Sequence, residues 1–183
     1  MPGKPMRKNA LANRERILAA AEEVFGERGE LGSTEEVARR ANVGIATVFR
    51  HFPTKEALIE AALLRHFALL NEQAAALAAE PEPAPALRRL LATLIETGAT
   101  KLTLATLLGD PPQAVGAAAQ ELRATISGLL ERAKADGAVH QEVSVDEVYV
   151  LLRGLSQAIA IRPPDPATLR RAIEIVHRGL APS

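Results

Sequence analysis

The sequence predicts an all-α protein, in which a small N-terminal unit of three helices precedes a larger helical body. Hydrophobic residues make up 48% of the 183 residues but aromatic residues only 3%, so the core must consist mainly of Ala, Leu, Val and Ile. These side chains suit closely packed helices better than a β-sandwich, which favours aromatic and β-branched residues. Apolar residues recur at helical spacing along most of the chain, and Gly and Pro separate these stretches.

The N-terminal segment is expected to begin as an arm and to continue as a helix. Residues 1–11 include three basic residues and are predicted to be flexible. Either plain disorder or insertion into a minor groove of DNA would suit such an arm. Asn13 is a suitable N-cap, and an apolar stripe follows it at helical spacing, which predicts a first helix over 13–27.

Two short helices around a tight turn are predicted next. Ser33 and Glu36 have the spacing of a capping box, in which each side chain accepts a hydrogen bond from a backbone N–H at the helix start. Residues 42–44 predict a turn, and a third helix is expected over 45–51 because Pro53 prevents its continuation. Together these elements have the spacing of a helix-turn-helix.

The rest of the chain is expected to form six further helices, separated by Gly and Pro. Thr54 is the predicted cap of the first, and Ser144 and Glu147 form a second capping box. Asp165 followed by Pro is a strong start signal for the last helix. These helices are expected over 54–80, 85–97, 99–108, 112–135, 145–161 and 165–179.

The charges are distributed unevenly between the two ends of the chain. The formal net charge is zero, yet residues 1–55 hold 10 Lys/Arg against 7 Glu, a net charge of +3. Residues 56–183 hold 12 Lys/Arg against 15 Asp/Glu, a net charge of −3. The difference is small, but a basic end on a slightly acidic body suits a unit that faces DNA phosphates.

Several other classes of protein are disfavoured. The chain has no Cys, which excludes disulfides, thiolate metal sites and cysteine nucleophiles. Its four His residues show no paired ligand spacing, and it has no Gly-rich phosphate loop, nucleophile elbow or HExxH motif. We therefore expect no enzyme, no metal and no cofactor. No signal peptide or apolar stretch of about 20 residues occurs, so the expectation is a cytoplasmic protein without a membrane partner.

The third predicted helix has an outward face suited to the major groove of DNA. Val43, Val48 and Phe52 can anchor this helix, which leaves its other side chains facing outward. Small, apolar and hydrogen-bonding side chains on such a face allow close approach and base contacts. Arg50 could read a guanine edge or pair with a neighbouring Glu. The predicted recognition surface consists of Gly44, Ile45, Ala46, Thr47, Phe49 and Arg50.

These N-terminal segments resemble the tetracycline-repressor (TetR) family of bacterial transcriptional regulators. The resemblance rests on RERILAAAEEVFGERG, STEEVARRANV and GIATVFRHFPTKEALIEAAL, which cover about residues 13–64. It implies a homodimer that binds a near-palindromic operator in double-stranded DNA, by default as a repressor, with a C-terminal domain that binds a small-molecule effector. The expected domains are then the arm over 1–11, a DNA-binding domain over 12–58 and an effector-binding and dimerisation domain over 59–183.

The resemblance also implies individual DNA contacts. The helix N-terminus capped by Thr54 already favours an anion, and the ammonium of Lys55 adds a charge there, so a phosphate is the expected occupant. Arg14 is expected to contact the DNA backbone at the start of the first helix. The family contacts carried over to this sequence are those at Thr34, Thr47, Phe49, His51 and Lys55.

Two positions depart from the family pattern. Phe49 stands where the family usually has a Tyr whose hydroxyl reaches a phosphate, so that contact is lost here. Gly44 stands where Ser is common, which leaves the third helix less firmly capped. The specificity of this chain is therefore expected to depend on DNA shape and methyl contacts more than on bidentate hydrogen bonds.

The dimer is expected to form through the last two helices. The helix over 145–161 is apolar on two faces and therefore needs two partners, its own core and another surface. That second surface is either another chain or simply its own domain. The expected dimer interface consists of Leu151, Gly154, Leu155, Ala158, Ile161, Leu169, Ile173 and Val176.

The effector is expected to be mostly apolar or amphipathic and to lie between aliphatic walls, because one Tyr and four Phe cannot build aromatic cages. Hydroxyls at helical spacing in an apolar segment could orient such a ligand. The candidate residues are His66, Thr93, Thr97, Thr100, Tyr149, Arg153 and Gln157. Two alternatives stay open: partly exposed threonines without a ligand, and a regulator that responds to a protein or acts constitutively.

Overall fold

The computed structural model describes residues 4–182 and contains, in that range, eight α-helices, one short 3₁₀ helix and no strand, which confirms the all-α prediction. None of the described helices combines the length and the apolar character needed to cross a membrane. In chain order the elements are α1 (Lys4–Arg28), η1 (Gly29–Leu31), α2 (Thr34–Arg40), α3 (Ile45–His51), α4 (Lys55–Ala78), α5 (Pro83–Leu108), α6 (Gln113–Ala135), α7 (Val145–Ile161) and α8 (Pro166–Leu180).

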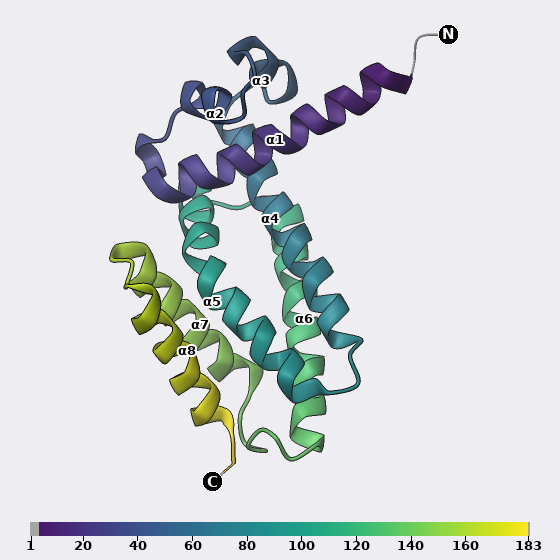
Figure 1. Cartoon of the computed structure of the whole chain (residues 1–183), viewed down its shortest axis with the longest axis vertical. Coiled ribbons are helices and arrows are strands. Elements are labelled where there is room, and N and C mark those ends of the chain that lie inside the picture. The colour runs from purple at the N-terminus through teal and green to yellow at the C-terminus, as the bar shows by residue number, and fades with distance from the viewer. Residues whose placement is uncertain (1–3, 183) are drawn as a thin grey trace.

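The helices form two parts, a small end made by α1, α2 and α3 and a larger body (Figure 1). Helix α1 crosses one end, with α2 and α3 on its outer side, and α4 leads from this end into the body. In the body, α5 packs against α4, α6 and α7, and α8 packs against α5. The helix-turn-helix therefore lies at one end of the molecule, while α4 and α5 connect it with the body because both also pack against α1.

One continuous apolar core extends through both parts. Near the helix-turn-helix it contains Ile17, Val24 and Phe25 of α1, against which Val37 and Val48 pack from α2 and α3. All five of these side chains are fully buried. Burial of this kind holds α3 rigidly, because each buried aliphatic side chain contributes about 1.5–3 kcal/mol relative to exposure.

The first helix is longer than predicted. The arm expected over residues 1–11 is helical from Lys4 onward, and residues 1–3 lie outside the described part of the chain. Pro5 is tolerated in the first turn of a helix, and no Gly or Pro interrupts the chain again before Gly26. Asn13 lies inside this helix, where its side chain accepts a 2.6 Å hydrogen bond from Arg16 instead of capping.

Helix α5 is continuous where two helices, over 85–97 and 99–108, were predicted. The predicted break at Gly98 was wrong, because this residue is buried inside the helix at its crossing with α7. A Cβ atom at Gly98 would lie 2.0 Å from Ser156 Oγ. The glycine is thus required by the close approach of two helices and does not mark a helix end.

The two predicted capping boxes have different outcomes. Ser144 and Glu147 form the complete reciprocal box at the start of α7. Ser33 caps α2 by accepting from Glu36 N, but the reciprocal bond is absent there, because the Glu36 carboxylate pairs with Arg28 at 3.2 Å and with Arg39 at 3.5 Å. Glu36 therefore links α2 to the end of α1.

Candidate functional site

The turn before α3 places this helix on the outer surface. Asn42 adopts a left-handed conformation with φ 52°, which Asn tolerates better than most residues, and Val43 N donates to Ala38 O at 3.0 Å. Gly44 occupies the N-cap of α3 without a side-chain hydrogen bond, which agrees with the weak cap expected from its sequence. Val48 is the buried anchor of the helix.

The outward face of α3 is apolar and small, with one exposed guanidinium. Ile45 is 37% exposed and Phe49 is 45% exposed, large values for such side chains. Ala46 is also exposed, and Thr47 and His51 are half-buried. Arg50 is exposed and makes no ion pair with any residue that the structure describes, in contrast to the Glu pairing considered from the sequence.

Several other arginines of the N-terminal part are neutralised by carboxylates. Arg40 pairs with Glu27 at 3.1 Å and with Glu23 at 3.4 Å, and these carboxylates raise its pKa. Arg14 is exposed, lies 3.9 Å from Glu15 and stacks over Phe52 at 5.4 Å from the ring centroid. Arg50 therefore differs from Arg14 and Arg40 in presenting an uncompensated charge.

Lys55 has a structural role that the sequence did not reveal. Its ammonium donates to Gly32 O at 2.7 Å and to Glu30 O at 3.0 Å, and it lies 5.3 Å from the ring centroid of Phe25. The start of α4 is thereby fastened to the segment that leads into α2. Two of its three N–H donors are used in this way, which leaves one for a phosphate. Thr34, at the start of α2, is buried to 8% exposure.

A cavity of about 360 Å³ lies in the body between α5 and α7. Phe67 of α4 lines it, together with Val115 and Leu122 of α6 and several aliphatic side chains of α5. Two cationic side chains, Lys101 of α5 and Arg153 of α7, also line it. The volume lies within the range typical of small-molecule sites, and the mostly apolar walls with a few polar groups are typical as well.

The polar groups of this cavity are perturbed by their surroundings. Burial lowers the pKa of Lys101, and the positive charge of Arg153 lowers it further. The Lys101 ammonium lies 5.9 Å from the ring centroid of Phe67. Burial raises the pKa of Tyr149, against the opposing charge of Arg123, whose guanidinium stacks 4.8 Å from the Tyr149 ring centroid.

Of the seven predicted effector residues, three line this cavity: Tyr149, Arg153 and Gln157. The other four do not. Thr93 accepts a 3.0 Å hydrogen bond from Gln73, and Thr97 donates to the Thr93 carbonyl at 2.8 Å.

The two remaining candidates lie against α1. Thr100 packs against Gly26, where an added Cβ would be 2.9 Å from the threonine methyl group. His66 Nδ1 lies 3.2 Å from Glu22 Oε2. These two side chains join α1, which carries the helix-turn-helix, to the body. Sequence reasoning missed Lys101, although it is the one charged residue between Glu96 and Asp110 in an otherwise apolar and hydroxyl-bearing stretch.

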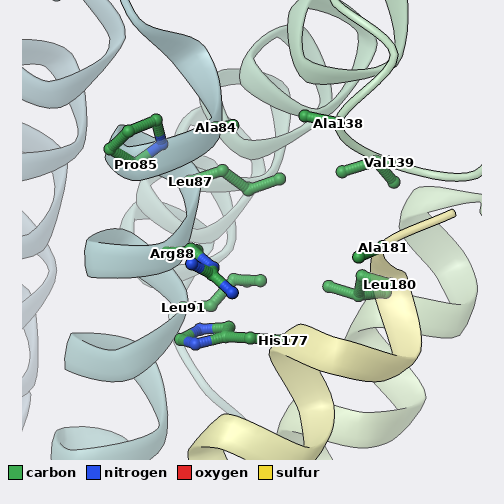
Figure 2. A pocket seen from close by; sticks show the side chains of 10 residues that line it. All are labelled: Ala84, Pro85, Leu87, Arg88, Leu91, Ala138, Val139, His177, Leu180 and Ala181. Carbon is green, nitrogen blue, oxygen red and sulfur yellow. The ribbon is translucent and has the colours of Figure 1, made fainter.

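A second cavity of about 270 Å³ lies at the end of the body away from the helix-turn-helix, where α5 begins. Figure 2 shows the side chains that line it. The start of α5, the segment after α6 and the end of α8 surround it, and Arg88 and His177 are its polar side chains. Burial lowers the pKa of His177, and the charge of Arg88 lowers it further. This cavity has no side chain from α4, and so no direct contact with the helix that leads to the helix-turn-helix.

An apolar surface, here named the α7/α8 face, lies exposed on the last two helices. Its large members are Val150 at 70% exposure, Leu151 at 43%, Ile161 at 76% and Ile175 at 64%. Gly154, on the same helix as the first three, has open space where a Cβ would point. Ala158 is exposed as well.

Among the other residues predicted for the dimer interface, Leu155, Leu169 and Val176 are half-buried. Ile173 is only 6% exposed and belongs to the core of its own chain, so its prediction as an interface residue was wrong. The exposed apolar residue of α8 is instead Ile175, two positions later. The prediction therefore placed Ile173 on the exposed face of α8, where the structure has Ile175 instead.

Comparisons with known proteins agree with this architecture. The family model described as bacterial regulatory proteins, tetR family, matches residues 17–62, and the model described as transcriptional regulator SbtR-like, C-terminal domain, matches residues 82–182. An uncharacterized HTH-type transcriptional regulator of Bacillus subtilis (strain 168), YvkB, is 44% identical over 52 residues, which span only 28% of each chain.

Solved structures extend the similarity to nearly the whole chain. A TetR transcriptional regulator from Streptomyces coelicolor is 33% identical, with a TM-score of 0.78 over 93% of this chain and 99% of the other. A TetR transcription regulatory protein from Mycobacterium vanbaalenii is 30% identical, with a TM-score of 0.77 over 97% of this chain and 100% of the other. The family consists of transcriptional regulators and not of enzymes, and the chain described here belongs to it: it is a DNA-binding regulator of the TetR family.

Proposed function

We propose that this regulator binds a near-palindromic operator as a homodimer, represses transcription, and leaves the DNA when a small effector occupies the cavity between α5 and α7. The observation that carries the DNA-binding part is the exposed face of α3, a short helix held rigidly at one end of the molecule. A dimer would place two such helices about 34 Å apart, in successive major grooves. It would act in the cytoplasm, where bacterial DNA lies.

The side chains of α3 have separate roles in this proposal. Ile45, Ala46 and Phe49 allow close approach and contact thymine methyl groups, while Thr47 and Arg50 hydrogen-bond to base edges. The uncompensated charge of Arg50 makes it the main base reader. Phosphates are contacted by Arg14, His51, the remaining N–H of Lys55 and the backbone at Thr34, and these contacts position the protein without reading sequence.

The dimer forms through the α7/α8 face. Four large apolar side chains on the last two helices are 43–76% exposed, and a second chain that covered them would remove this apolar surface from water. The open surface at Gly154 and the small side chain of Ala158 let the same helix of a second chain approach closely. A two-fold axis through α7 would then produce a four-helix interface, as the family resemblance implies.

Release from the operator follows from the position of α4. This helix begins at the DNA-binding part, where Leu58 is fully buried, and contributes Phe67 to the cavity two and a half turns later. An effector that favours a different tilt of α4 weakens operator binding by its differential affinity for the two states.

The test begins with selection of double-stranded operators from random-sequence DNA by the full chain. Binding of the selected operator is then measured by fluorescence anisotropy for Arg50→Ala and Thr47→Ala. Arg170→Ala is the matched control, because Arg170 is an exposed residue of α8, far along the chain from α3. Loss of a base contact is worth about 1–3 kcal/mol, and the homodimer loses one in each half-site, so Arg50→Ala should weaken specific binding by roughly 30-fold or more. Unchanged affinity for both α3 variants would refute the assignment of α3 as the reader.

A further inference from the structure

The cavity between α5 and α7 holds two positive charges and no negative one. Lys101 and Arg153 both line it, and no Asp or Glu does. Neither side chain makes an ion pair with any residue in the described range 4–182, whereas Arg28, Arg40 and Arg65 are all paired with carboxylates. A paired cation in the same body shows the contrast: Lys134, buried to 9% exposure, contacts Glu131 at 2.8 Å.

This arrangement is unfavourable in the empty protein. Lys101 is half-buried among apolar side chains, which weakens its hydration, and the exposed Arg153, which also lines the cavity, adds repulsion. Partial burial of an uncompensated charge is costly, and a second positive charge nearby adds to that cost. The face of the Phe67 ring compensates Lys101 only in part, because a cation–π contact is weaker than an ion pair. An anion between the two cations would relieve both unfavourable effects.

The other side chains that line the cavity indicate the chemistry of the rest of the ligand. Leu94 and Leu102 of α5, Val115 and Leu122 of α6 and Leu152 of α7 are aliphatic, and they make up most of the lining. The hydroxyl of Ser156 is occupied with the Leu152 carbonyl at 2.7 Å, so it has no proton to donate to a ligand. These walls suit a hydrocarbon body and offer few partners to a strongly polar one.

We infer that the effector is an amphipathic anion, an aliphatic carboxylic acid in its ionised form, whose carboxylate lies between Lys101 and Arg153 and whose chain lies among the leucines. This inference rests on the proposed role of the cavity as the effector site. From the sequence, the effector was expected to be apolar or amphipathic; this inference adds that it carries a negative charge. It also explains why Lys101 lies in an otherwise apolar segment.

Three probes of equal chain length separate charge from apolar contact: sodium octanoate, 1-octanol and octylammonium chloride. Binding to the full chain is measured by isothermal titration, and stabilisation by the shift in Tm. Octanoate is expected to bind at least about tenfold more tightly than octanol, the difference expected for one charge-assisted hydrogen bond. Octylammonium is expected not to bind.

Lys101→Met keeps the length of the side chain and removes its charge. We expect this variant to raise the Tm of the ligand-free protein, because a poorly hydrated cation is removed, and to weaken octanoate about tenfold or more. Octanol should bind this variant at least as tightly as it binds the parent chain. Lys134→Met is the matched control: it removes a buried but ion-paired lysine outside the cavity and should leave octanoate binding unchanged.

The outcomes distinguish this inference from the proposed function. Equal binding of octanol and octanoate, no binding of any probe, or undiminished octanoate binding by Lys101→Met would overturn the anionic class. Octanoate binding that depends on Lys101 but leaves operator affinity unchanged would support the ligand class and refute release by the cavity. Release of the operator by octanol but not by octanoate would support release through the cavity and refute the anionic ligand class.

Discussion

The crossing of α5 and α7 at Gly98 is the position where a single methyl group should have the largest structural effect. A Cβ at Gly98 would lie 2.0 Å from Ser156 Oγ and 3.0 Å from Ser156 Cβ. Ser156 is buried and its hydroxyl donates to the Leu152 carbonyl at 2.7 Å. Gly98→Ala must therefore either separate the two helices or turn the serine away from its acceptor.

The magnitude follows from three contributions. Overpacking of a buried position costs about 1–3 kcal/mol, and the lost serine hydrogen bond costs about 1 kcal/mol. The better helix propensity of Ala offsets about 1 kcal/mol. The free energy of unfolding should then fall by about 1–3 kcal/mol, which lowers Tm by roughly 2–12 °C for a chain of this size.

The assay is urea denaturation of the full chain at one fixed protein concentration, because dimerisation would make stability depend on concentration. Gly128→Ala is the control, since Gly128 lies inside α6 with nothing within 4 Å of the added Cβ. That variant should be more stable than the parent by about 0.5–1 kcal/mol. Ser156→Ala in the Gly98→Ala background should recover part of the loss. Stabilisation of similar size in Gly98→Ala and Gly128→Ala would refute the close approach of α5 and α7.

Four further predictions concern the DNA-binding end, the dimer and the last helix. Lys55→Met removes two ammonium hydrogen bonds to the segment before α2, so the free energy of unfolding in urea should fall by about 1–3 kcal/mol. If Lys55 of each protomer also contacts a phosphate, the negative slope of log K against log salt should become shallower by about 1.8, and an unchanged slope would leave Lys55 only the structural role. Phe49→Tyr adds a hydroxyl to the exposed face of α3 in each half-site and should tighten operator binding by roughly 5–150-fold in anisotropy, whereas equal or weaker binding would place this ring away from the phosphates. Gly154→Leu adds a large side chain to the centre of the α7/α8 face, so light scattering should show monomers where Gly128→Leu still gives dimers; a dimeric Gly154→Leu protein would move the interface elsewhere. Asp165 accepts hydrogen bonds from Thr168 Oγ, Thr168 N and Ala167 N, which lower its pKa. Its stabilising effect is therefore complete above the ordinary Asp pKa and is lost as pH falls through the lowered value, so Asp165→Ala should destabilise the protein at pH 7 but much less at a pH below the lowered pKa.

The fold class and the helix-turn-helix could be predicted because they depend on local patterns. The turn before α3 is encoded by residues 42–44, the anchor by Val48 and the break by Pro53, all within one short segment. The complete capping box at Ser144 and Glu147 is local in the same sense. In each case the residues that determine the structure are neighbours along the chain, so the periodic pattern already contains the interaction.

The residues that line the cavity could not be predicted equally well, because a cavity is formed by residues from several helices. Thr93, Thr97 and Thr100 have the spacing of one helix face, but Thr100 is directed toward α1 and the other two hydroxyls are occupied outside the cavity. Helical periodicity states which side chains share a face and not which neighbour that face meets. For the same reason Ile173 was assigned to a partner chain although it packs in its own core.

The sequence by itself determined the all-α class, the family and the outward residues of α3, because a short amphipathic helix after a tight turn can bury only one set of side chains. Only the tertiary structure decided that Gly98 lies inside one continuous helix, that Lys55 holds the segment before α2, and that Lys101 faces Arg153 in a cavity without a carboxylate. These three depend on contacts between residues more than 20 positions apart. Their energies come from burial and close approach, which the order of residues along one helix does not reveal.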